Sequence, residues 1–104
     1  MDEIIGKWVQ IEGQPYEGLW FIFSPDGKFE AKYDPMGIES SGTYELAEGK
    51  IDLNQTAHTF GLVGMFKGVY SIADDILKMS IAASADHERP DTLNDARIYR
   101  KEME

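Results

Sequence analysis

The chain has 104 residues, the length of one typical domain, and we expect a single domain over residues 1–104. It contains no cysteine, which excludes disulfides, thiolate chemistry and cysteine-based zinc sites. Its 19 acidic and 10 basic residues give a formal net charge of -9, which disfavours binding to nucleic acid or to an anionic membrane surface. We interpret this charge mainly as a source of solubility, with a cationic partner as the alternative.

The chain opens with Met1-Asp2-Glu3 and lacks the basic start and apolar run of a secretory signal. No stretch approaches the roughly 18 apolar residues that a membrane-spanning helix needs. These features predict a cytoplasmic protein, or a secreted or periplasmic one if a signal segment has been removed.

The apolar residues follow a period of two far better than one of 3.6, and turn-forming sequences recur at short intervals. Over residues 28–33, for example, apolar and charged side chains alternate cleanly. Turn sequences such as Ser24-Pro25-Asp26-Gly27 separate the apolar segments. We expect strands over about residues 6–12, 19–24, 28–33, 39–46, 51–55, 65–72, 76–83 and 95–101.

About eight short strands joined by short connections predict an all-β fold. The two terminal strands must pair with each other or remain as exposed edges, which promote aggregation. We therefore expect an antiparallel up-and-down barrel of about eight strands, with a two-sheet sandwich as the alternative.

The segment Gly6-Lys7-Trp8 on the first expected strand resembles the Gly-x-Trp opening of lipocalin and streptavidin-like calycin barrels. The resemblance implies that Trp8 closes one end of the barrel and packs against a basic residue of the last strand. Arg97 or Arg100 could supply that residue, since a guanidinium stacks favourably on an indole ring.

The second half of the chain is similar to a family of uncharacterised bacterial lipocalin-like domains. The resemblance rests on Gly68-Val69-Tyr70-Ser71-Ile72, Asp75-Ile76-Leu77-Lys78-Met79 and Arg89-Pro90, in this order. The chain lacks the cysteine that such domains often carry on the Leu-Lys strand. Because the family has no established activity, the resemblance implies a fold and says little about function.

Many large side chains fall on expected inward positions and either fill the barrel or line a pocket for a small apolar or aromatic molecule. Small inward residues, at Ala31, Gly42, Gly68 and Ala83, would leave space beside the rings. We expect no cofactor. The candidate ligand-binding residues are Phe21, Phe23, Tyr33, Tyr44, Tyr70 and Met79.

The loop region 58–66 is unusually apolar because it contains Phe60, Leu62 and Val63, which are flanked by glycines. It could fold back on its own core, cover the barrel mouth as a lid, or form a homodimer interface. A surface interaction module that dimerises through this loop is our alternative to small-molecule binding.

No motif selects a catalytic set of residues, and we do not expect an enzyme. Asp86-His87-Glu88 groups possible metal ligands, but three consecutive loop residues rarely converge on one ion. We interpret this cluster as a solvated loop and expect no metal site.

Overall fold

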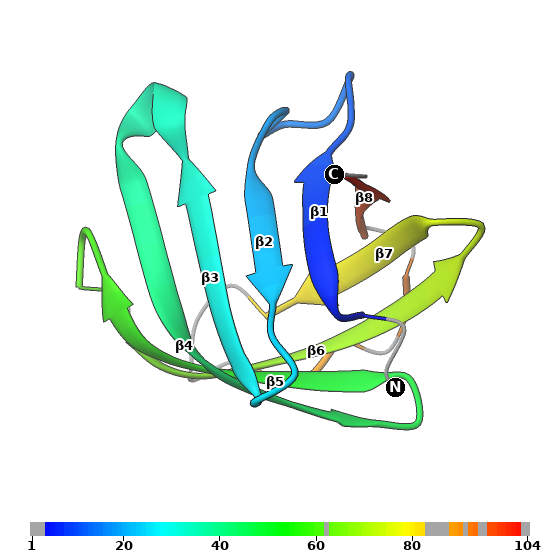
Figure 1. Ribbon diagram of the computed structural model, residues 1–104. Coiled ribbons are helices and arrows are strands. Elements are labelled where there is room, and N and C mark those ends of the chain that lie inside the picture. The colour runs from blue at the N-terminus through cyan, green and yellow to red at the C-terminus, as the bar shows by residue number, and fades with distance from the viewer. Residues whose placement is uncertain (1–3, 62, 83–87, 91, 94–95, 103–104) are drawn as a thin grey trace.

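The computed structural model describes residues 4–61, 63–82, 88–90, 92–93 and 96–102. Eight antiparallel strands form a closed barrel in which each strand pairs with its neighbours in sequence and β8 pairs with β1 (Figure 1). This arrangement confirms the predicted all-β, up-and-down barrel. The strands are β1 (Gly6–Gln10), β2 (Trp20–Phe23), β3 (Lys28–Tyr33), β4 (Ile38–Ala47), β5 (Lys50–His58), β6 (Gly64–Ala73), β7 (Ile76–Ile81) and β8 (Arg97–Lys101).

Two tight hairpin turns fix the register of the longer strands. Glu48 and Gly49 both have positive φ angles, of 43° and 82°, between β4 and β5. Asp74 and Asp75 do the same between β6 and β7, with φ angles of 53° and 63°. Such turns twist with the same hand as the strands that they join, and Asp and Gly tolerate this backbone region.

The β1–β2 and β3–β4 connections are longer than a two-residue hairpin turn. β1 ends at Gln10 rather than at residue 12, and the chain makes a longer excursion before β2. A short 3-10 turn, Asp34–Met36, joins β3 to β4. No helix in the described part of the chain has the length and apolar character required to cross a membrane.

One end of the barrel is closed by a packed core. Trp8 is fully buried, and its indole N–H donates a hydrogen bond of 2.8 Å to the carbonyl of Ile4, which is itself 1% exposed. The segment before β1 therefore lies against the core at this end. Phe23, Phe29 and Tyr44 continue the core with ring contacts, including an edge-to-face contact of 5.0 Å between Phe23 and Tyr44.

Arg89, in the connection from β7 to β8, is anchored to the outer side of β5 and β6. Its guanidinium donates to the carbonyl oxygens of Gly68, at 2.8 Å, and Ile51, at 3.3 Å, and to the Asp52 carboxylate at 2.7 Å. Ile51 is fully buried in the barrel interior. Successive side chains of a strand point to opposite faces, so the Asp52 side chain points outward. Arg89 is thus tied to the barrel by charge-assisted hydrogen bonds.

We expect Arg89→Gln to lower the free energy of unfolding by about 2 kcal/mol, because it removes a charge-assisted anchor and leaves Asp52 without its cation. Asp52→Asn should have a smaller effect, and the double variant should show that the two losses are not additive. Urea unfolding of the four proteins measures this coupling. Arg100→Gln, at an exposed position of β8, is the matched control and should change stability little.

Candidate functional site

The two ends of the barrel differ in how tightly they are filled. The core described above closes the end where β1 begins, whereas a cavity of about 400 Å³ lies inside the barrel toward the opposite end. At this second end lie the connections β1–β2, β3–β4, β5–β6 and β7–β8; the first two stand at the top of Figure 1. We call it the open end.

Most of the cavity wall is apolar. Side chains from β2, β5, β6 and β7 point inward at alternate positions and form this part of the wall together with Leu19, which comes just before β2. Met79, which is 2% exposed, connects the wall to the packed core. The apolar lining residues are Leu19, Phe21, Leu53, Phe66, Met79 and Ile81.

A polar group of side chains lies on the opposite part of the wall. Gln10 and Tyr99 are cross-strand partners on β1 and β8. Arg97 lies two residues before Tyr99 on β8 and also lines the cavity. Burial raises the pKa of Tyr99 to about 12, against the smaller lowering effects of a side-chain hydrogen bond with Gln10 and of the Arg97 charge. The Tyr99 hydroxyl therefore remains protonated at neutral pH.

The predicted ligand-binding residues do not lie together. Phe21 and Met79 line the cavity. Phe23 and Tyr44 belong to the packed core, where the Tyr44 hydroxyl donates 2.7 Å to the carbonyl of Ser24. Tyr70 is half-buried against that core.

Tyr33 lies at the open end of β3 and meets Tyr16 edge-to-face, with ring centroids 5.6 Å apart. The inward glycines do not create the space that we expected beside the rings. A methyl group at Gly42 would overlap the carbonyl of Asn54, and one at Gly68 would overlap the Ile81 side chain. Close approach of neighbouring strands has already used these gaps, and Ala83 lies outside the described residues.

The cation over the Trp8 ring is Lys101, with its Nζ 5.7 Å from the ring centroid. Strand register explains this choice, since Trp8 pairs with Lys101 across β1 and β8. Arg97 lies at the other end of β8, opposite Met79, and lines the cavity. A basic residue of the last strand thus covers Trp8, but it is neither Arg97 nor Arg100.

Exposed apolar side chains surround the open end. Phe60 and Val63, in the predicted interface loop, are 63% and 53% exposed, and Leu62 lies outside the described residues. Every large hydrophobic side chain that is exposed in the described part of the chain belongs to this end. We call this set the apolar rim: Tyr16, Met36, Phe60, Val63 and Met65.

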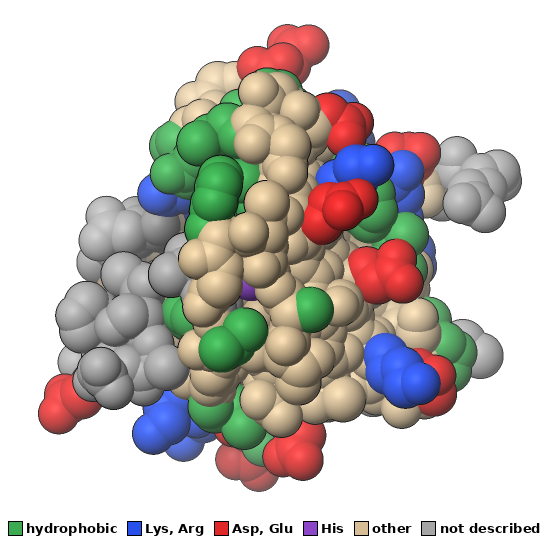
Figure 2. Space-filling model, turned by 90° about the vertical axis from the view of Figure 1, so that its left-hand side faces the viewer, with side chains coloured by type: hydrophobic (Ala, Val, Ile, Leu, Met, Phe, Trp, Pro, Cys, Tyr) green, Lys and Arg blue, Asp and Glu red, His purple; other side chains and the backbone are tan. Residues whose placement is uncertain are grey.

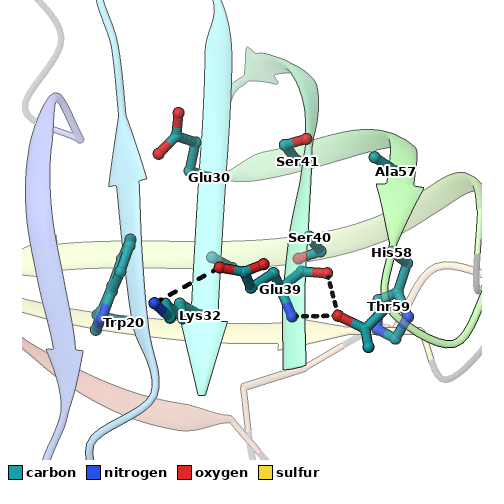
Figure 3. A pocket seen from close by; sticks show the side chains of 10 residues that line it. Trp20, Glu30, Lys32, Glu39, Ser40, Ser41, Ala57, His58 and Thr59 are labelled. Atoms are coloured by element: carbon teal, nitrogen blue, oxygen red, sulfur yellow. Dashed lines mark hydrogen bonds and ion pairs between the residues drawn. The ribbon is translucent and has the colours of Figure 1, made fainter. Parts of the chain in front are cut away.

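A second hollow, of about 420 Å³, lies between β2 and the β5–β6 connection (Figure 3). Several of its polar groups contact one another. Lys32 forms an ion pair of 3.5 Å with Glu39, and the Thr59 hydroxyl accepts from the backbone N–H of Glu39 at 2.7 Å. Lys7 covers the ring of Trp20 at 4.9 Å. We interpret this hollow as a set of surface contacts that tie neighbouring strands together.

Sequence reasoning missed the polar part of the cavity wall. Gln10 follows Trp8 by two residues, so strand alternation already places it on the inward face. A polar side chain at an inward position was the available signal. Within the described residues no group of three potential metal ligands occurs, and Asp86 and His87 of the proposed cluster lie outside them.

The geometry defines a small antiparallel barrel with one packed end and one internal cavity. No protein family, curated protein or solved structure matches the chain. The function is therefore argued from the cavity and its surroundings alone.

Tyr99 gives the folded protein a distinctive alkaline behaviour. Its folded-state pKa of about 12 exceeds the ordinary value of 10.0, so the unfolded chain releases this proton first as pH rises. The contribution of Tyr99 to the free energy of unfolding is complete below pH 10. It is lost as pH rises to about 12, which lowers the free energy of unfolding by up to about 3 kcal/mol. Urea unfolding from pH 9 to pH 12 should show this loss. A Tyr99→Phe variant should lose less stability over the same interval; an identical loss would contradict the assignment.

Proposed function

We propose that the barrel binds a small, largely apolar molecule in the cavity at its open end. The observation that carries this proposal is the apolar wall built by Phe21, Leu53, Phe66 and Met79 inside a closed barrel. A concave apolar site with a few convergent polar groups is the usual form of a small-molecule site. Its volume, about 400 Å³, falls in the range of such sites.

The apolar rim supports the same proposal. Its side chains lie on three separate connections and at the start of β6, and they share only their position around the open end. An apolar guest would lose water in two steps, first against the rim and then inside the cavity. Rim residues such as Phe60 would then contact the guest during entry.

We further propose that the chain is a lipocalin-like barrel. Three features support this proposal: the meander of eight antiparallel strands, Trp8 at the packed end, and Lys101 of the last strand over its ring. They match what the Gly6-Lys7-Trp8 resemblance implies. The proposal concerns fold family and adds no activity.

Neutral N-phenyl-1-naphthylamine tests the container directly, because its fluorescence rises when it leaves water. We expect saturable binding to the protein and at least about tenfold weaker binding to Ile81→Trp, in which a larger side chain occupies the cavity. Fluorescence titration at neutral pH measures both affinities.

Ile22→Trp is the matched control, because Ile22 lies on β2 with its side chain outside the barrel, between inward-facing Phe21 and Phe23. It adds the same ring without entering the cavity and should leave affinity unchanged. Absence of probe binding to the unaltered protein would contradict the proposal. So would equal binding by both variants, once thermal unfolding shows that each is folded.

The exposure of Phe60 and Val63 favours a second candidate function, an interaction module that forms a homodimer through the loop region 58–66. Figure 2 views the barrel from the side of β4 and the β5–β6 connection. It shows a band of hydrophobic side chains toward the left of the described surface, with charged side chains mostly toward the right and also at the top and bottom. A second copy could bury the exposed Phe60 and Val63 side chains and leave the charged side chains of this face in water.

Under this second proposal we expect native mass spectrometry to give a doubled mass for the unaltered protein and a single mass for Phe60→Asp. The buried carboxylate would oppose association. Met36→Asp, which changes another exposed rim residue outside the loop, should leave the dimer intact. A single mass for the unaltered protein at high concentration would contradict the interaction module and leave the container proposal standing.

A further inference from the structure

Exposed carboxylates stand beside the apolar rim on the β1–β2 connection. Glu12 and Glu17 are both exposed, and Glu17 directly follows Tyr16 of the rim. Arg100 borders the same outer hollow as the two glutamates, but within the described residues neither glutamate forms an ion pair. This part of the rim therefore combines an exposed aromatic ring with two carboxylates that a cationic partner could approach.

The β3–β4 connection has the same combination of apolar and acidic side chains. Met36 is 55% exposed and follows Asp34 by two residues in the 3-10 turn. The Lys32 Nζ lies 3.7 Å from the Asp34 carboxylate and 3.5 Å from that of Glu39, so two carboxylates share one cation. This group of three charges is therefore negative as a whole.

The arginines near the open end do not cancel this negative charge. Arg97 lines the internal cavity. Arg89 is held on the outer side of β5 and β6, where its guanidinium pairs with the carboxylate of Asp52. A partner that approaches the apolar rim thus meets carboxylates on two of the connections, on a chain whose net charge is -9.

The β5–β6 connection supplies apolar surface without charge. Phe60 and Val63 are more than half exposed, and residues 59–63 include no charged side chain. Met65, at the start of β6, adds a third exposed apolar side chain. Figure 2, which faces this connection, shows hydrophobic and acidic side chains on the same side of the molecule. The rim therefore offers apolar contacts on three connections and carboxylates on two of them.

We infer that the apolar rim docks a cationic amphipathic segment of another protein, with lysine or arginine on one side and large apolar side chains on the other. Its apolar side chains cover rim residues such as Tyr16 and Phe60, and its cationic groups lie near Glu17 and Asp34. A second copy of this chain fits less well, because two molecules that each carry a net charge of -9 repel each other. Docking at the rim takes place on the outer surface and requires no guest in the cavity.

The apolar and the acidic side chains of this surface have different roles in docking. Removal of the rim side chains from water supplies most of the favourable free energy. Exposed charge pairs each contribute little affinity, but they accelerate the encounter, disfavour acidic partners and weaken in salt. The rim thus selects a partner that has both large apolar side chains and positive charge.

A fluorescein-labelled model peptide, in which leucine and lysine follow the helical period, is the probe. One matched peptide has glutamate in place of lysine, and a second has serine in place of leucine. We expect fluorescence anisotropy at neutral pH to show saturable binding of the leucine–lysine peptide, which weakens as the sodium chloride concentration rises. Each matched peptide should bind at least about tenfold more weakly.

Two double variants that remove the same charge locate the binding surface. Glu12→Gln with Glu17→Gln, at the rim, should weaken peptide binding about fivefold. Asp74→Asn with Asp75→Asn is the matched control, because the exposed β6–β7 turn lies at the other end of the barrel and asparagine tolerates its positive φ angles. It should change the affinity by less than about twofold.

Phe60→Ser with Val63→Ser tests the apolar part of the surface without changing the charge. Because both side chains are more than half exposed, we expect the fold to persist and peptide binding to weaken about tenfold. Thermal unfolding verifies that each variant is folded.

Three results would overturn the docking inference. The first is absence of binding by the leucine–lysine peptide. The second is equal weakening by the two charge-removing double variants, which would show attraction to the net charge alone. The third is a dimer that Phe60→Asp separates and the peptide does not, which would assign the rim to a second copy. None of these results involves the cavity, so the container proposal stands or fails separately with the titration of N-phenyl-1-naphthylamine.

Discussion

The pairing of β1 with β8 is the constraint on which the rest of the structure depends. It closes the barrel, leaves no unpaired terminal edge, and sets Trp8 opposite Lys101 and Gln10 opposite Tyr99. One register therefore produces both ends of the molecule. At the closed end it buries an indole under a lysine and against Ile4, and two residues further along β1 it brings the Gln10 amide and the Tyr99 hydroxyl into one cavity.

This arrangement separates stability from binding along the barrel axis. Aromatic contacts such as that of Phe23 with Tyr44 fill the closed end, where the side chains are held at near-complete burial. Toward the open end the inward residues become half-buried and more polar, and the rim exposes large apolar groups.

Much of the candidate site follows from strand alternation, once the inward face is known. Alternation from Trp8 reaches Gln10, and alternation within residues 97–101 separates Arg97, Tyr99 and Lys101 from the exposed Arg100. The sequence pattern does not say how far along the barrel axis each inward side chain lies. This is why Tyr44 and Phe23, which are inward but near the closed end, were grouped with Phe21 and Met79, which reach the cavity.

The sequence by itself determined the strand count, the closed antiparallel barrel and the turns, because period-two alternation and residues with positive φ act locally. Only the tertiary structure decided which strand ends meet. The stagger between β1 and β8 selects Lys101 over Arg97 as the cover of Trp8, and the close approach at Gly42 and Gly68 removes space that their size alone suggested. Both results depend on distances between strands that are remote in sequence, which local residue patterns do not encode.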